Sequence, residues 1–186
     1  MSPDVPDLGS LAQFILQTTW VLYTTFRFGW SAQQNGWSLF AVGATGFIVQ
    51  GFLLRRLMAR VSGQRLVLAG LASAAICHFG WAVATQGWMM YAFIAANLLS
   101  FAVVPTLQSI VSAAADQTNQ GQTMGAVAAL SSLASVLGPV VGASLLGFVS
   151  HLPPGDWRMG APFFVTAALL VACTVIAAQQ FSARKA

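Results

Sequence analysis

Six stretches of this sequence are each about twenty residues long and almost free of charged side chains. An α-helix needs about 20 mostly apolar residues to cross the hydrocarbon core of a bilayer. Between the stretches lie arginines, glycines, prolines and short polar turns, which interrupt or end helices. We therefore expect six transmembrane helices, at about residues 8–26, 36–54, 66–85, 89–115, 124–149 and 161–181.

The scarcity of charge supports this interpretation. Charged residues make up only 6% of the 186 residues, whereas a soluble domain carries about 25%. So few charges cannot cover the surface of a soluble domain, and the apolar surplus must face lipid. The sequence predicts an all-α membrane protein in which residues 1–186 form a single six-helix domain. A net charge of +4 is also too small for a nucleic-acid-binding surface, so no nucleic acid partner is expected.

The basic residues predict how the helices are oriented. If the N-terminus lies inside, the inner segments hold Arg55, Arg56, Arg60, Arg65, Arg184 and Lys185. The outer loops then hold Arg27 and Arg158. Cytoplasmic loops of membrane proteins carry an excess of Lys and Arg. We therefore expect a multi-pass protein of the cell inner membrane with both termini in the cytoplasm.

Few residues offer catalytic or metal-binding chemistry. The two cysteines, Cys77 and Cys173, lie inside apolar stretches and are most simply small buried side chains. The sequence has no CxxC pair, His/Cys cluster or phosphate-binding loop, so we expect no metal and no cofactor. An intramembrane serine protease would need a GxSG motif, and Gly142-Ala-Ser-Leu lacks its second glycine. We therefore do not expect an enzyme.

Two predicted helices carry polar and aromatic side chains at helical spacing. On the first helix they are Gln13, Gln17, Trp20 and Thr24. On the fourth they are Asn97, Phe101, Pro105 and Gln108. Such intervals place side chains on one helix face, and polar groups within a membrane usually face protein or water. Two interpretations remain open: the stripes line a central cavity, or they form interhelical hydrogen bonds worth about 0.6 kcal/mol each.

Two further motifs lie in the second-to-third helix connection and in the fifth helix. The connection has the pattern Gly-x3-Arg-Arg-x6-Gly-x-Arg and comprises Gly51, Arg55, Arg56, Gly63 and Arg65. The fifth helix contains Gly125, Ala134, Gly138, Pro139 and Gly142. A GxxxG face lets another helix backbone approach closely, and an internal proline bends the helix. These features suit a helix that pivots, although a topology signal and simple packing would also explain them.

The chain resembles the major facilitator superfamily through these motifs and through four short segments. The segments are Trp20-Val-Leu-Tyr23, Phe28-Gly-Trp30, Pro105-Thr-Leu-Gln108 and Gln120-Gly121. From about residue 11 to residue 181 the chain looks like the C-terminal half of tetracycline-resistance-type drug/proton antiporters. The resemblance implies a 3+3 repeat of six helices whose first and fourth helices line the cavity. It also implies that the basic connection is a cytoplasmic latch and that the glycine–proline helix is the antiporter signature, with Ala134 replacing one glycine.

The resemblance implies membrane transport in drug efflux and antibiotic resistance, with a drug-like small molecule as substrate. The family has two six-helix halves, so we expect a truncated or split transporter that is not competent alone. Its expected surroundings are the lipid bilayer and either an N-terminal half or a second copy. Glutamate is absent and all four aspartates lie outside the predicted helices, so no membrane carboxylate can carry a coupling proton. His78, on the third helix, is more simply a structural residue. The alternative is a non-transporting protein that keeps the fold as an interaction partner.

Overall fold

The computed structural model describes residues 4–114, 120–153 and 155–183, and all regular structure within those ranges is helical. The elements are α1 (Asp4–Phe28), α2 (Ala32–Ile48), η1 (Val49–Leu53), α3 (Leu54–Arg60), α4 (Gly63–Val83), α5 (Gly87–Ala96), η2 (Asn97–Ala102), α6 (Val103–Ala114), α7 (Gln120–Val149), η3 (Trp157–Gly160) and α8 (Ala161–Ala183). The predicted all-α architecture is confirmed.

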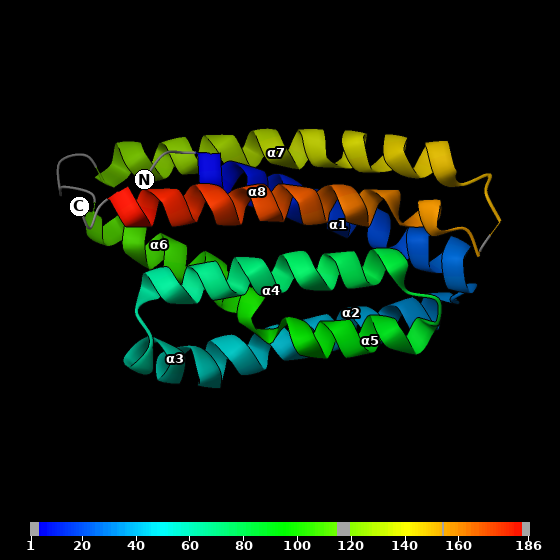
Figure 1. Ribbon diagram of the computed structural model, residues 1–186, viewed down its shortest axis with the longest axis horizontal. Helices are drawn as coiled ribbons and strands as arrows, with labels where there is room; N and C mark the ends of the chain where they lie inside the picture. The colour runs from blue at the N-terminus through cyan, green and yellow to red at the C-terminus, as the bar shows by residue number, and fades with distance from the viewer. Residues whose placement is uncertain (1–3, 115–119, 154, 184–186) are drawn as a thin grey trace.

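Long helical rods lie side by side along one axis of the molecule (Figure 1). α2, the π-helix η1 and α3 follow one another without a break and form one continuous helix over residues 32–60. α5, the 3₁₀-helix η2 and α6 form a second continuous helix over residues 87–114. The chain therefore runs up and down the bundle, with its connections gathered at the two ends (Figure 1).

Five of the described helices are long and apolar enough to cross a membrane, one fewer than predicted. They cover Ala32–Arg60, Gly63–Val83, Gly87–Ile110, Gly125–Val149 and Trp157–Ala183. The first predicted span, residues 8–26, falls in α1, which is not among them. α1 is long enough at 25 residues, but it contains Gln13, Gln17 and four threonines, which lower its mean hydropathy.

The connection between α3 and α4 differs most from the prediction. Residues 55–65 were expected to separate two helices, but α3 continues to Arg60. Val61 then turns to an extended conformation, and α4 begins at Gly63. Arginine is a good helix former, so the basic residues extend the helix instead of ending it. Most of the basic residues of this connection therefore lie on α3, a helix that projects from the end of the bundle.

Close contact with α7 and α8 holds α1 in the bundle, and α4 packs against α8 and η2. The α1–α7 contact depends on two glycines. A Cβ atom added to Gly138 would collide with the Cβ of Phe14, and one added to Gly142 would lie 2.9 Å from Cγ2 of Thr19. The absence of a side chain at both positions therefore lets the two backbones approach closely.

Proline explains the 3₁₀ segment η2. Pro105 has no N–H to donate to the carbonyl of Phe101, and its ring crowds that carbonyl. The helix tightens to 3₁₀ geometry over Asn97–Ala102 and resumes α geometry from Val103. η2 also contacts η1 of the neighbouring rod, so two irregular segments lie side by side in the bundle.

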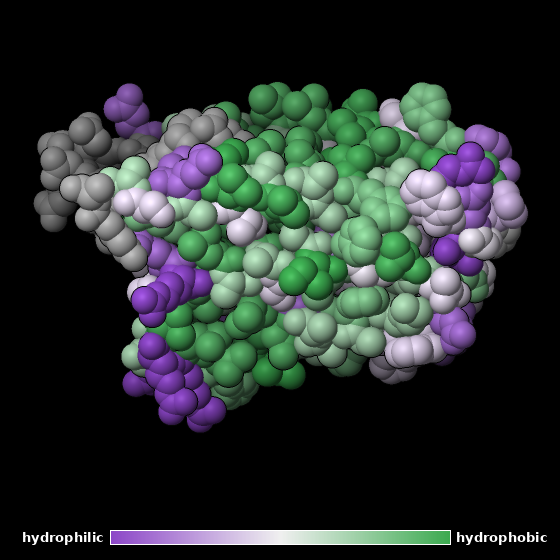
Figure 2. Space-filling model, in the orientation of Figure 1, coloured by the Kyte–Doolittle hydropathy of each residue, from purple (hydrophilic) through white to green (hydrophobic). Residues whose placement is uncertain are grey.

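The surface is divided by polarity. Figure 2 shows a hydrophobic belt across the middle of the face that is drawn, with hydrophilic residues gathered at its two ends. Large apolar side chains such as Phe40, Phe47, Ile76 and Phe148 are more than half exposed. An apolar belt of this kind is what a bilayer requires of the surface that faces it.

Candidate functional site

Half of the polar stripe on α1 forms hydrogen bonds to α2. Nε1 of Trp20 donates to Oγ of Ser38 over 2.9 Å. Oγ1 of Thr24 lies 2.6 Å from Oδ1 of Asn35. All four side chains are buried. For Trp20 and Thr24, the structure therefore matches the interpretation in which the stripe joins neighbouring helices.

The other half of the α1 stripe is exposed. Gln13 and Gln17 lie on the same rod, toward its N-terminal end, and both are exposed. Neither makes a hydrogen bond with the described part of the chain. α1 thus presents two exposed amide side chains that have no partner among the described residues. In a bilayer these amides need water or a partner, because hydrocarbon offers no hydrogen bond.

The second stripe is divided in a similar way. Asn97, at the start of η2, is buried, and its Oδ1 atom has no hydrogen-bond partner among the described residues. Phe101 is half-buried, with its ring 3.2 Å from the position of a Cβ on Gly46 of α2. Gln108, on α6, is exposed. A buried acceptor without a donor costs about 1–3 kcal/mol, so Asn97 is a position where the fold is not optimised for stability.

Arg27 is a site residue that the sequence analysis treated only as a topology signal. It is buried at the end of α1, where Gly29 (φ 65°) turns the chain out of the helix. Nε and Nη2 of Arg27 donate to the carbonyl of Ala84 over 3.3 and 3.2 Å. Nη1 donates to the carbonyl of Asp156 over 2.6 Å. One side chain thereby joins α1 to the α4–α5 and α7–α8 connections.

The same end of the molecule carries an ion pair and a cavity. The Asp156 carboxylate accepts hydrogen bonds from the side chain and the backbone N–H of Arg158, which lower the pKa of Asp156 to about 2. A cavity of about 590 Å³ lies beside Arg27 and is lined in part by Trp30, Gln34 and Gln86. It does not include any residue of the two polar stripes, so it is not the cavity predicted from the sequence.

His78 occupies a structural environment. Its Nδ1 lies 2.8 Å from Oγ1 of Thr166, which joins α4 to α8. The Thr166 hydroxyl also donates to the carbonyl of Phe163, so its lone pair is free to accept the Nδ1 proton. The His78 ring packs against Trp81, with 5.0 Å between ring centroids. This arrangement agrees with the expectation of a buried, hydrogen-bonded histidine.

The two sequence motifs occupy different environments. On α7, Gly138 and Gly142 face α1, Pro139 is half-buried, and Gly125 is exposed with no atom near a built Cβ. At the inner connection, Gly51 lies in η1 and is exposed, as are Arg55, Arg56 and Arg65. Gly63 begins α4 close to Thr106 of α6. Asp116, in the predicted inner loop, lies outside the described residues.

The acceptors on α2 were not predicted from the sequence. Asn35 and Ser38 bond to α1, and Tyr23 donates to the carbonyl of Trp81 over 3.0 Å. Asn35 and Ser38 are three residues apart near the start of α2, and their partners Thr24 and Trp20 are four residues apart near the end of α1. Both intervals place side chains on one helix face, which was a signal that could have paired the two helices.

Residues 8–182 match the family model of the Major Facilitator Superfamily. The chain is 31% identical over 160 residues to "Tetracycline resistance protein, class D" of Salmonella ordonez, a match that covers 86% of this chain and 40% of that protein. It is 31% identical over 154 residues to the class C protein of Escherichia coli, covering 83% of this chain and 38% of the relative. A human relative, "Major facilitator superfamily domain-containing protein 10", is 32% identical over 139 residues, 70% of this chain and 29% of its own length. The chain thus spans about 40% of the length of the tetracycline resistance proteins it matches.

Proposed function

Because this chain belongs to the major facilitator superfamily of membrane transporters, we propose that it forms the second six-helix half of a drug efflux antiporter of the tetracycline-resistance type. In this proposal α1 is the sixth membrane span, and its low hydropathy reflects a polar face turned toward the transport pathway. The substrate is a drug-like small molecule. Two halves that rock about a midplane site are the general design of such transporters.

The observation that carries the proposal is the exposed pair Gln13 and Gln17. They are polar, unpartnered within the described residues, and placed on a helix that packs along its length against α7 and α8. A helix in this position would have no reason to present amides to lipid. A water-filled cavity shared with a second half would solvate them. Asn97, Phe101 and Gln108 complete the proposed lining on the η2–α6 rod, and Trp20 and Thr24 fix its edge against α2.

The proposal gives the two motifs mechanical roles. The cytoplasmic loop motif of Gly51, Arg55, Arg56, Gly63 and Arg65 forms a latch in which Gly63 packs against Thr106 of α6 and the arginines stay exposed at the end of the bundle. The α7 motif of Gly125, Gly138, Pro139 and Gly142 is the close-packed segment on which α7 pivots. The contacts of Gly138 and Gly142 with α1 support the second role, because a pivot requires backbones in contact.

We predict that this chain alone gives no proton-coupled efflux. It lacks glutamate, its four aspartates lie outside the six apolar ranges predicted from the sequence, and His78 is already hydrogen-bonded to Thr166. Tetracycline accumulation in cells that express only this chain should equal that of cells without it. Coexpression with the part of the class D relative outside the match should lower accumulation, and collapse of the proton gradient should abolish the difference.

The matched control for the cavity residues is Gln179, which is also exposed but lies on α8. Gln17→Ala should weaken the efflux of the coexpressed pair, and Gln179→Ala should not. Gradient-dependent efflux by this chain alone, lost in Gln17→Ala, would contradict the proposal of a half-transporter and favour a homodimer. Failure of coexpression to restore efflux would favour a non-transporting membrane protein.

We also predict that both termini lie in the cytoplasm. The proposed inner segments carry six basic residues and the outer connections two. Reporter fusions at residue 186 should give a cytoplasmic signal, and fusions within residues 86–88 should give a periplasmic one. A periplasmic signal at residue 186 would overturn both the orientation and the assignment of α1 as a span.

A further inference from the structure

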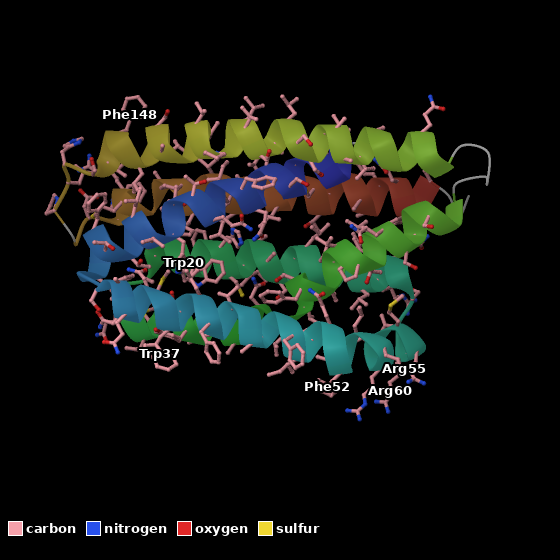
Figure 3. The ribbon with its side chains drawn as sticks, turned by 180° about the vertical axis from the view of Figure 1, so that it is seen from behind. Trp20, Trp37, Phe52, Arg55, Arg60 and Phe148 are labelled. Atoms are coloured by element: carbon pink, nitrogen blue, oxygen red, sulfur yellow. The ribbon has the colours of Figure 1, made fainter. Side chains whose placement is uncertain are left out.

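The continuous helix of α2, η1 and α3 has an unusually open surface. Only 17% of its apolar span is buried inside the bundle, the lowest value among the five candidate spans. Phe47 and Phe52 are 69% and 63% exposed. Figure 3 shows Phe52, Arg55 and Arg60 projecting on the same side, away from the rest of the bundle. Aromatic and basic side chains therefore share one outward surface.

The π-helix η1 creates this arrangement. The N–H of Leu54 bonds to the carbonyl of Val49, five residues earlier. Side chains five residues apart in an α-helix point roughly 140° apart, because each residue turns the helix by about 100°. The wider π turn brings them closer together. The rings of Phe47 and Phe52 accordingly meet edge to face, with 5.9 Å between their centroids.

Arginines follow this aromatic pair directly. Arg55, Arg56 and Arg60 are exposed on α3, and Arg65 is exposed at the start of α4. None of the four makes a hydrogen bond or ion pair with the described part of the chain. The carboxylate of Asp156 lies in the connection between α7 and α8, at the opposite end of the bundle (Figure 1). This end of the protein thus presents several exposed guanidinium groups that form no ion pair with the described residues.

We propose that this surface binds an anionic phospholipid. The guanidinium groups of Arg55, Arg56 and Arg60 bind its phosphate, and Phe47 and Phe52 contact its acyl chains. Arginine forms paired hydrogen bonds with phosphate oxygens, which suits it to a lipid headgroup. Eight residues separate Phe47 from Arg55, a rise of roughly 12 Å in an α-helix. That distance fits within one leaflet, whose hydrocarbon layer is about 15 Å thick.

The combination of groups favours a lipid over other occupants. Free phosphate would use the arginines and leave the aromatic pair without a role. A zwitterionic lipid has no net charge to balance three guanidinium groups. A partner helix would need carboxylates opposite all three arginines as well as an apolar face. The inference requires only that the helix over residues 32–60 spans the membrane, so it stands independently of the proposed transport activity.

Native mass spectrometry of the full chain, purified in detergent with equal amounts of phosphatidylglycerol and phosphatidylcholine, tests the inference. The wild type should retain phosphatidylglycerol in preference to phosphatidylcholine. Arg60→Gln should lower that retention about fivefold, since a basic residue near an anionic membrane surface contributes about that factor. Arg158→Gln, which removes one exposed charge at the opposite end, should leave the retention unchanged. Arg60→Lys keeps the charge and should retain most of the lipid, which also guards against misfolding of the glutamine variant.

The aromatic half of the site has its own matched pair. Phe52→Ala should lower lipid retention, whereas Phe148→Ala, the same change at an even more exposed position on α7, should not. Inorganic phosphate at millimolar concentration should fail to displace the lipid. Equal retention of the two lipids, equal effects of Arg60→Gln and Arg158→Gln, equal effects of Phe52→Ala and Phe148→Ala, or full displacement by inorganic phosphate would each overturn the inference.

Discussion

Replacing Gly138 with leucine is expected to disrupt the bundle more than any other single change considered for α7. A Cβ at this position collides with the Cβ of Phe14, and the backbone carbonyl carbon of Phe14 lies 3.1 Å away. The backbone of α1 cannot yield as a flexible side chain would, so the two helices must separate. Overpacking of a core typically costs about 1–3 kcal/mol, and we expect a loss at the upper end of that range. Thermal unfolding in detergent, followed by size-exclusion chromatography, measures the effect.

Gly147 provides the control for this experiment. It lies on the same helix, is exposed, and has no atom within 4 Å of a built Cβ. Gly147→Leu makes the same chemical change without the steric conflict, so the unfolding temperature should stay near that of the wild type or rise slightly with helix propensity. Equal destabilisation by the two variants would show that glycine content, and not the α1–α7 contact, controls the stability of α7.

Arg27→Met is expected to cost about 3 kcal/mol, because the buried carbonyl of Ala84 and the part-buried carbonyl of Asp156 would lose their donor, and each such loss costs about 1–3 kcal/mol. The guanidinium bridges the carbonyls of Ala84 and Asp156. Methionine fills a similar volume but donates no hydrogen bond. The separated connections should also become more accessible to protease, so limited proteolysis gives a second readout beside the unfolding temperature.

Two further variants make the Arg27 result specific. Arg27→Lys keeps the charge but cannot reproduce the planar fork of donors, so it should recover only part of the lost stability. Arg158→Met removes a neighbouring arginine whose side chain is 57% exposed, and should leave the unfolding temperature unchanged. If Arg27→Lys were fully stable, charge alone would explain the role of Arg27, and the bridging geometry would not be needed.

Much of the fold was accessible from the sequence because apolar length and scarcity of charge dominate it. The helical class and most helix positions follow from those two properties. The prediction for residues 55–65 was wrong because charged residues were expected to end the helix, although Arg55, Arg56 and Arg60 extend it as α3. The π-helix η1 could not be predicted, because its sequence, Val-Gln-Gly-Phe-Leu, contains no residue that requires the wider turn.

The sequence predicted the candidate site only as two helix faces that carry polar and aromatic side chains. The spacing of Gln13, Gln17, Trp20 and Thr24 places them together, but spacing does not state which of them meets another helix. That division depends on where α2 crosses α1, which brings Ser38 to Trp20 and leaves Gln17 open. Arg27 was missed for a related reason. Its partners are backbone carbonyls of distant connections. Every residue has a backbone carbonyl, so the sequence does not show which of them accepts a hydrogen bond.

The packing of α1 against α7 and α8 also has a consequence for biosynthesis. The C-terminal end of α1, Phe28, and the start of α7, Gln120, are 92 residues apart in the sequence. At a synthesis rate of about 5–20 residues per second, α1 is made about 5–20 s before synthesis of α7 begins. The contacts of Gly138 and Gly142 with α1 cannot form until then. During that interval α1 can already bond to α2 through Trp20 and Thr24, to α4 through Tyr23, and to the α4–α5 connection through Arg27. The proposed span of lowest hydropathy is therefore made long before α7 and α8, and its hydrogen bonds to α2, α4 and the α4–α5 connection are the contacts that can hold it until they are synthesised.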